Sequence, residues 1–248
     1  MKDKQLTYSF ANKWGIYSAT YFVSPNADNV HSTIVFVHGF RARKEWYSWI
    51  GKCLASKGYS VLQFTVPSNA LKNPYQWSDG IRSAIDYLQN KESPVHNEVG
   101  SEEVGVMGHS MGGLGALIAA REDYRIKCTV SLAPAIIPQF FSISKDIASI
   151  STPVQLQIGS NDGLIPPETI KTFFNCLSSS QKSYVEIEGG NHIRFMDKSV
   201  VSIVGEYLSR FGVVGKLLKD RKATITFEEQ HFKSSNSFVE WFDNHLKP

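Results

Sequence analysis

The sequence predicts an α/β fold, with a mostly parallel, doubly wound sheet of about eight strands and helices on both faces. Two observations lead to this prediction. Short runs of β-branched and aromatic residues alternate with segments of helical periodicity through most of the chain. The run at 33–37 is apolar at nearly every position, as in a parallel strand that is buried on both faces. The chain has 248 residues, enough for one domain with a sizeable core.

The first half of the chain begins with two strands and continues with alternating helices and strands. Residues 7–22 are rich in Tyr, Phe and Thr and predict two strands joined near residue 12. Residues 46–54 carry apolar side chains at helical spacing, and Gly58 ends that helix. The further elements expected here are strands at 33–37, 59–64 and 104–107 and helices around 81–88 and 114–120.

The second half continues this alternation and then departs from it. The elements expected up to residue 211 are strands at 126–132, 154–158 and 183–187 and helices at 166–176 and 200–211. The connection at 135–151 is irregular and too short for a large cap domain. We therefore expect a catalytic domain over 1–211 and a C-terminal appendage over 212–248 that packs on it, because the appendage is too short for its own core. The appendage is expected to hold an edge strand at 223–227 and a short helix around 238–242.

Composition and charge exclude several classes of protein. Hydrophobic residues make up 42% and charged residues 20% of the chain, as in ordinary globular proteins. The formal net charge of +3 is too small to indicate nucleic-acid binding. No apolar run approaches the roughly 20 residues of a membrane span. The polar N-terminus lacks the apolar stretch of an export signal, so we expect a cytoplasmic location. No pair of cysteines has metal-ligand spacing, and no metal is expected.

The stretch Gly-His-Ser-Met-Gly-Gly at 108–113 is the strongest sign of chemistry in the chain. It lies between an expected strand and an expected helix, and its G-x-S-x-G spacing is that of a nucleophile elbow. In such a turn Gly108 and Gly112 let the strand and the helix approach closely. Ser110 then stands at a helix N-terminus, where partial positive charge favours a developing anion. Because Gly-rich turns also show this spacing by chance, the prediction depends on partners for Ser110.

A serine hydroxyl becomes a good nucleophile when a base takes its proton and an acid orients that base. His192 and Asp162 each directly follow an expected strand. Ser110, Asp162 and His192 also occur in the order expected for this type of elbow. The carboxyl ends of parallel strands are where chemistry gathers in such sheets. Asp146 and Asp197 are rivals for the acid, but neither directly follows a strand.

The transition state also needs two preorganised backbone N–H groups around the developing oxyanion. One is expected from Met111, which follows the nucleophile, and the other from Phe40, in the loop after the strand at 33–37. The residues expected to shape the substrate site around these donors are His38, Gly39, His109 and Ile165. Further candidates for the wall of an open cleft are Trp77 and Phe140.

These stretches resemble the α/β-hydrolase family, and within it the branch of bacterial cutinases, polyester hydrolases and dienelactone-hydrolase-like esterases. The resemblance runs from about residue 38 to 211. Its matching stretches are 49–50, 54–59, 85–88, 106–113, 162, 165–166 and 190–192. The resemblance implies an α/β-hydrolase fold, ester hydrolysis without a cofactor, and an aromatic side chain lining the acyl pocket where Phe40 stands.

Three departures from the polyester hydrolases point to a smaller substrate. Those enzymes carry a Trp directly after the Pro beyond the elbow helix, whereas here Pro134 is followed by Ala135. They usually have a C-terminal disulfide, which is not expected here because none of residues 177–248 is a cysteine. Residues 212–248 extend beyond the family pattern. Dienelactone hydrolases proper use a Cys nucleophile, where this chain has Ser110, so that activity is not implied.

The sequence therefore predicts a serine carboxylic-ester hydrolase that acts on small or medium acyl or aromatic esters through an acyl-enzyme. The expected partner is a small ester, with no nucleic acid, and the oligomeric state stays open. A lactonase, an acyl transferase or a weak polyester hydrolase would use the same three residues. A non-catalytic receptor with this fold would be expected to have lost one of them, and all three are present.

Overall fold

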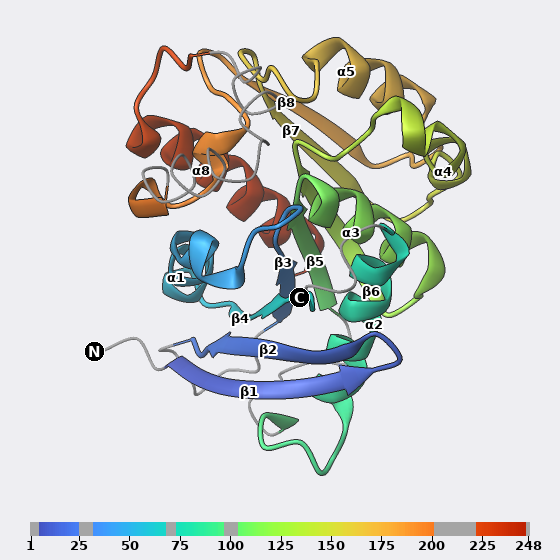
Figure 1. Cartoon of the computed structure of the whole chain (residues 1–248), viewed down its shortest axis with the longest axis vertical. Coiled ribbons are helices and arrows are strands. Elements are labelled where there is room, and N and C mark those ends of the chain that lie inside the picture. Colours follow the sequence, from blue (N-terminus) through green and yellow to red (C-terminus); the bar gives the residue numbers. More distant parts are fainter. Residues whose placement is uncertain (1–4, 25–31, 68–72, 97–103, 201–221, 247–248) are drawn as a thin grey trace.

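One mixed sheet organises the molecule (Figure 1). The computed structural model describes residues 5–24, 32–67, 73–96, 104–200 and 222–246. Within these residues, eight strands lie in the order β1-β2-β4-β3-β5-β6-β7-β8. The strands are β1 (Gln5–Asn12), β2 (Gly15–Phe22), β3 (Thr33–Val37), β4 (Ser60–Thr65), β5 (Val104–His109), β6 (Ile126–Leu132), β7 (Val154–Gly159) and β8 (Lys182–Ile187). β1, β2 and β4 pair antiparallel, and the other pairs are parallel. The predicted fold class is confirmed.

Helices cover both faces of this sheet (Figure 1). α1 (Ser48–Ser56) and α8 (Phe227–His245) pack together on one face, whereas α2 (Tyr75–Gln89) and α3 (Met111–Glu122) pack together on the other. The other described helices are η1 (Lys44–Tyr47), η4 (Pro138–Phe140), α4 (Phe141–Ile147), α5 (Pro167–Cys176) and η5 (Ile193–Phe195). In the described part of the chain, no helix has the length and apolar character needed to cross a membrane.

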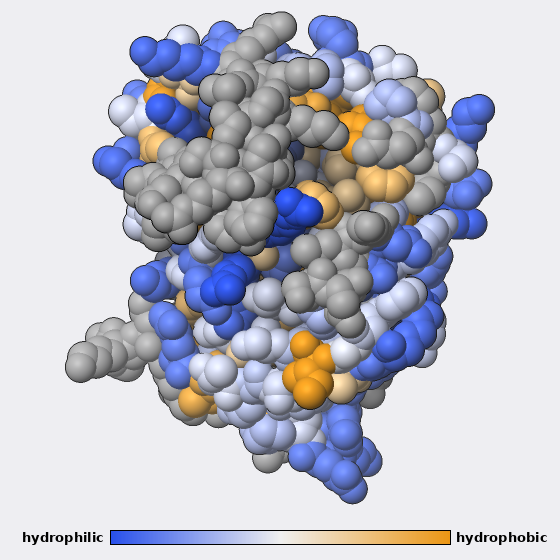
Figure 2. Space-filling model, viewed as in Figure 1, coloured by the Kyte–Doolittle hydropathy of each residue, from blue (hydrophilic) through white to orange (hydrophobic). Residues whose placement is uncertain are grey.

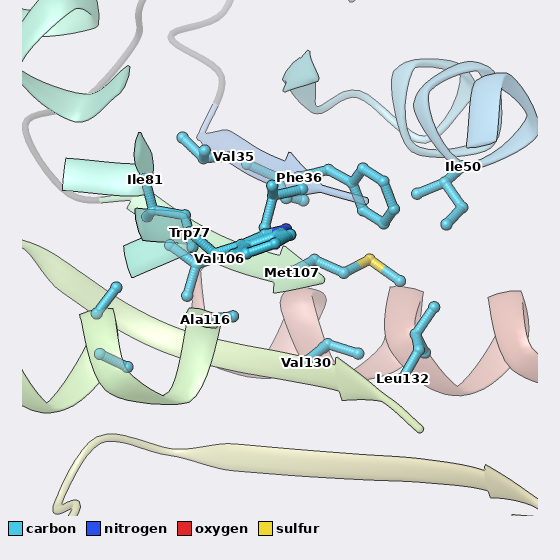
Figure 3. Packing of buried hydrophobic residues seen from close by; sticks show 14 of the residues in the cluster. Val35, Phe36, Ile50, Trp77, Ile81, Val106, Met107, Ala116, Val130 and Leu132 are labelled. Atoms are coloured by element: carbon cyan, nitrogen blue, oxygen red, sulfur yellow. The ribbon is translucent and has the colours of Figure 1, made fainter. Parts of the chain in front are cut away.

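The core lies along the central strands, directly beneath the predicted site. All residues of β3 and β5 are buried, because helices cover both faces of these strands. Figure 3 shows Phe36 of β3 and Met107 of β5 beside Trp77 of α2, and Ile50 of α1 lies nearby. Close packing of this kind leaves few voids. The carboxyl ends of β3 and β5 are therefore held in fixed positions.

The start of α8 differs from the prediction. Residues 223–227 form no strand, and the helix begins at Phe227. The Thr226 side chain accepts the Glu229 N–H, and the Glu229 carboxylate accepts the Thr226 N–H. This capping box satisfies two backbone donors that a helix start otherwise leaves unpaired. These two reciprocal hydrogen bonds favour the start of a helix here over an edge strand.

α8 is also longer than the short helix predicted around 238–242. It has 19 residues, and its buried side combines Phe238 and Phe242 with the polar Gln230 and Ser234. Polar residues on the buried side obscure the apolar spacing from which a helix is recognised. Because Phe238 and Phe242 are fully buried, α8 is an integral layer of the fold. The domain boundary between 211 and 212 stays a prediction.

Two further segments bear on the prediction. The connection at 135–151 was expected to be irregular, but it contains the short helices η4 and α4. No large cap lies in this connection. The helix predicted at 200–211 falls outside the described residues except for Val200, which is buried.

Candidate active site

Ser110 occupies a strained turn between β5 and α3. Its backbone has φ 56° and ψ −116°, a region that residues with a side chain rarely adopt. Such strain persists only where the surroundings over-determine it. Here the Ser110 N–H donates to Leu132 O at 2.8 Å, and Ser110 O accepts the N–H groups of Leu114 and Ala135, each at 3.0 Å. Ser110 is therefore held at the carboxyl edge of the sheet, as the elbow prediction requires.

Two glycines make this turn sterically feasible. A Cβ at Gly108 would lie 2.2 Å from Gly112 O, and a Cβ at Gly112 would lie 2.4 Å from Val37 O. These contacts are with backbone atoms, which cannot move aside as a flexible side chain can. The G-x-S-x-G pattern therefore reflects how closely α3 approaches both β5 and the end of β3.

Asp162 and His192 form a buried pair beside this turn. Asp162 follows β7, His192 follows β8, and His192 Nδ1 lies 2.7 Å from Asp162 Oδ2. The exposed fraction is 7% for the His192 side chain and zero for that of Asp162. The other carboxylate oxygen, Oδ1, accepts the N–H groups of Leu164 at 2.9 Å and Ile165 at 2.7 Å. The turn after β7 therefore aims Oδ2 at the imidazole.

This geometry assigns the proton of His192 to Nδ1. An ionised carboxylate can only accept hydrogen bonds, so His192 Nδ1 must be the donor to Asp162. Nε2 of the same ring then carries the lone pair that a general base needs. The His192 ring lies 4.6 Å, centroid to centroid, from the ring of His109. Because His109 directly precedes Ser110, the base and the elbow meet at the same edge of the sheet.

The two rival acids lie elsewhere. Asp197 Oδ2 accepts the Ser48 N–H at 2.8 Å and so caps the start of α1. Asp146 is an exposed residue of α4. Asp162 is thus the one of the three for which the structure shows a hydrogen bond with His192.

The loop after β3 lies against Ser110. A Cβ at Gly39 would be 3.1 Å from the Cβ of Ser110, so a side chain at this position would require Ser110 to shift slightly. The Val66 N–H donates to His38 Nε2 at 2.9 Å, and therefore His38 Nδ1 carries the proton that bonds Gly39 O at 2.6 Å. The C=O and N–H of a trans peptide point in opposite directions. The Phe40 N–H consequently points away from the His38 ring.

The two predicted oxyanion donors remain available. Among the described residues, no acceptor pairs with the Phe40 N–H or the Met111 N–H. Met111 is the first residue of α3, where the helix dipole increases the partial positive charge at its N–H group. The Phe40 side chain is 45% exposed. These positions fit an oxyanion hole, a role that stays a prediction for both residues.

His38 and His109 support the site from within the core. Both imidazoles are buried. The Tyr47 hydroxyl lies 2.8 Å from His109 Nδ1 and accepts the N–H of Gly39, the residue after His38, at 3.4 Å. Burial lowers the pKa of His38 to about 4. Burial, and then the neighbouring His192, lower the pKa of His109 well below its ordinary value. Both side chains are therefore neutral at pH 7 and hold their neighbours in place.

Replacing His38 by Gln is expected to make stability less dependent on pH between about 6.5 and 4. In this window the unfolded chain takes up a proton that folded His38, with its pKa of about 4, does not. The free energy of unfolding therefore falls as the pH falls, by on the order of 3 kcal/mol from His38. Because His109 is still present, the free energy of unfolding of His38→Gln should keep part of its dependence on pH. Denaturant unfolding at several pH values measures this dependence, with His245→Gln as the control. Equal pH dependence in His38→Gln and wild type would show that His38 does not contribute.

The predicted cleft wall is partly corrected. Trp77 is fully buried and donates its indole N–H to His38 O at 2.9 Å, so it cannot line a cleft. Phe140 is half-buried, as a wall residue could be. A mostly apolar cavity of about 550 Å³ lies between α4 and α5, with Ile136 and Phe173 in its lining. Figure 2 shows hydrophobic side chains gathered in the hollow near α3, α4 and α5.

Two supporting residues, Tyr47 and Gln230, were missed by the sequence interpretation. The sequence around Tyr47 predicts only a helix, and no sequence motif links Tyr47 to His109. Gln230 contacts the backbone of Asn191, next to His192, from α8. A capping box beginning at Thr226 was the one available signal for the helix start before Gln230.

Within the described residues, no group of three or more His, Cys, Asp or Glu side chains could hold a metal ion.

Comparisons with known proteins indicate the family to which the chain belongs. Residues 5–214 match a family model described as PETase, PET hydrolase-like. The chain is 31% identical over 176 residues to the bis(hydroxyethyl) terephthalate hydrolase of Streptomyces coelicolor, covering 69% of this chain and 54% of that protein. It is 27% identical over 186 residues to Cutinase 1 of Thermobifida cellulosilytica, covering 74% and 68%. The matched region thus spans about half to two thirds of the length of these relatives.

A solved structure supports the fold independently. Est1E from Butyrivibrio proteoclasticus superposes with a TM-score of 0.64 at 18% identity, over 84% of this chain and 97% of that one. At this identity the likeness concerns the fold alone. The family model, in contrast, covers most of the chain. The chain therefore belongs to the PET hydrolase-like family, and its fold is that of an α/β-hydrolase.

Proposed function

We propose that the chain hydrolyses carboxylic esters through an acyl-enzyme formed on Ser110. The observation that carries this proposal is the buried pair of His192 and Asp162, 2.7 Å apart, beside a serine held at φ 56°. Strain stored at one serine, together with an oriented base, is typical of a nucleophile and not of a structural turn. Membership of the PET hydrolase-like family supports the same reaction class.

We infer the following sequence of steps for these groups. Ser110 Oγ attacks the ester carbonyl carbon while His192 Nε2 takes the hydroxyl proton. The N–H groups of Phe40 and Met111 stabilise the tetrahedral oxyanion, and Asp162 stabilises the imidazolium. The tetrahedral intermediate expels the alkoxide, which receives the proton from His192 and leaves as the alcohol. Water, deprotonated by His192, then attacks the acyl-enzyme and releases the acid and free Ser110.

The substrate class proposed is small or medium acyl and aromatic esters. Phe40, which is 45% exposed, offers an apolar contact next to Gly39, whereas Ile165 is only 5% exposed. Ala135 is almost fully buried, and it stands where the resembling polyester hydrolases carry a Trp. A broad aromatic platform is therefore missing, which disfavours binding of a long polyester chain. A small terephthalate diester is a second candidate, favoured by the likeness to the Streptomyces coelicolor enzyme.

A substrate panel tests this proposal on the wild-type chain. We expect turnover of p-nitrophenyl acetate and butyrate without added metal or cofactor. We also expect the esters of a polyester film to be hydrolysed more slowly than a small terephthalate diester. A burst of p-nitrophenol would report the acyl-enzyme. No turnover of any ester at any pH between 6 and 9 would contradict the proposal and leave a non-catalytic receptor as the explanation.

The same panel separates the two reactions that share this triad. A lactone differs from a linear ester in keeping the alkoxide tethered to the acyl group, so a lactonase would turn over lactones much faster than linear esters. An acyl transferase would make ester product when an alcohol acceptor is added. We expect linear esters to be preferred and water to be the main acceptor.

A further inference from the structure

The first turn of α8 holds the loop that carries His192. Gln230 is completely buried, and its side-chain amide forms two hydrogen bonds with the main chain of Asn191. The Asn191 N–H donates to Gln230 Oε1 at 3.0 Å, and Gln230 Nε2 donates to Asn191 O at 2.9 Å. An amide can satisfy both groups at once because it carries a donor and an acceptor in one plane. The residue before His192 is therefore fixed in two directions.

The two glycines before Asn191 fit this contact. A Cβ at Gly190 would lie 2.7 Å from Gln230 Oε1, and a Cβ at Gly189 would lie 2.3 Å from Thr224 Oγ1. The Thr224 N–H also donates to Gly189 O at 2.9 Å. Gly189 has φ 75°, which glycine adopts without strain. The glycines of this turn thus allow close approach by the C-terminal segment.

The chain after His192 is held by the next residue of α8. His231 lies with Nε2 3.1 Å from Met196 O, and its ring stacks on Trp49 at 3.8 Å between centroids. The Trp49 indole N–H donates to Phe195 O at 2.9 Å. The loop is consequently fixed both before and after His192.

We propose that Gln230 is a positioning residue, which holds the His192 imidazole in line between Asp162 and Ser110. This inference rests on the proposed ester hydrolysis and extends it to α8, which lies outside the residues 5–214 that match the family model. A displacement of about 1 Å at a reacting group can cost roughly 100-fold in rate. Two buried hydrogen bonds at the adjacent residue oppose such a displacement.

Three variants test this role. Gln230→Leu removes both hydrogen bonds, and Gln230→Glu keeps the acceptor for the Asn191 N–H but, when ionised, replaces the donor to Asn191 O by a repelling charge. Ser234→Ala is the matched control, because Ser234 is equally buried one turn later in α8 and bonds Gln157 Oε1 at 2.6 Å. The readouts are kcat and KM per folded molecule for p-nitrophenyl butyrate, and the melting temperature.

We expect Gln230→Leu to lower kcat roughly 10- to 100-fold with little change in KM, because the base acts in the transition state. Ser234→Ala should lower the melting temperature and keep kcat. For Gln230→Glu, the ratio of its kcat to the wild-type value should rise as the pH falls. A protonated carboxyl group again offers one donor and one acceptor, and burial raises the pKa of a carboxyl group. Glu228, Glu229, His231 and Arg194, which surround this turn, are present in both enzymes, so the comparison with wild type isolates the change at residue 230.

The outcomes separate this inference from the proposed function. If Gln230→Leu kept the wild-type kcat, or if the Gln230→Glu ratio were flat with pH, the positioning role would be wrong although hydrolysis itself remained. An equal loss of kcat in Ser234→Ala would also overturn it, because the effect would then come from α8 packing. An inactive wild-type chain would refute the proposed function instead. If Gln230→Leu failed to fold, the pH profile of Gln230→Glu would decide.

Discussion

Replacing Ser110 by Ala is expected to lower kcat for p-nitrophenyl butyrate by roughly 10⁶-fold, the scale of nucleophile loss in a serine triad. Alanine removes only Oγ and leaves the hydrogen bonds of the Ser110 backbone to Leu132 and Ala135 in place. The elbow and the fold should therefore survive. His192→Ala should cost a similar factor, and the double variant should be no worse than either single variant, because the two residues act as one unit.

The control for this prediction is a serine away from the elbow. Ser179 is buried and bonds the carbonyl oxygens of Ser151 and Gln181, so Ser179→Ala should keep kcat. Circular dichroism and thermal unfolding would show whether Ser110→Ala remains folded. Full esterase activity in a folded Ser110→Ala variant would refute the assignment of the nucleophile.

Replacing Asp162 by Asn is expected to lower kcat by about 10⁴-fold while the fold is kept. The N–H groups of Leu164 and Ile165 both point at Oδ1, so the Asn side-chain oxygen must occupy that place. Its NH₂ group then faces His192 Nδ1, which has to become an acceptor. The proton moves to Nε2, and the imidazole can no longer take the proton of Ser110.

A second carboxylate serves as the control for Asp162. Asp123 is also buried and pairs with Arg125 through Nη2 at 2.6 Å, at the end of α3 remote from the elbow. Asp123→Asn should reduce stability and leave kcat unchanged. If Asp162→Asn kept kcat within 10-fold of wild type, the tautomer argument would be wrong, and the charge at Asp162 would have no part in orienting His192.

The positions of the three proposed triad residues could be predicted because each residue follows a strand end that is visible in the sequence. Apolar runs mark β5, β7 and β8, and Ser110, Asp162 and His192 are the reactive side chains that follow them. Parallel strands bring their carboxyl ends to one edge, so residues far apart in the chain meet there. The position of the loop after β3, close to Ser110, could be predicted for the same reason, and its oxyanion role stays a prediction.

The supporting contacts could not be predicted, because they depend on which surfaces pack together. His38 is neutral and fixed in one tautomer through the Val66 N–H, which belongs to a segment after β4. Gln230 and Ser234 are polar residues on the buried side of α8, and they interrupt the apolar spacing. Trp77 was expected at the cleft, but its indole N–H binds His38 O in the core. A cytoplasmic location also stays a prediction.

Covalent labelling with a fluorophosphonate, followed by mapping of the modified peptide by mass spectrometry, tests directly whether Ser110 is the nucleophile. We predict one adduct, on Ser110, formed much more slowly in His192→Ala and absent in Ser110→Ala, because only an activated serine at an oxyanion hole reacts in this way. No adduct on the folded wild-type chain, or an adduct on a different serine, would contradict the claim that Ser110 is the nucleophile of an esterase.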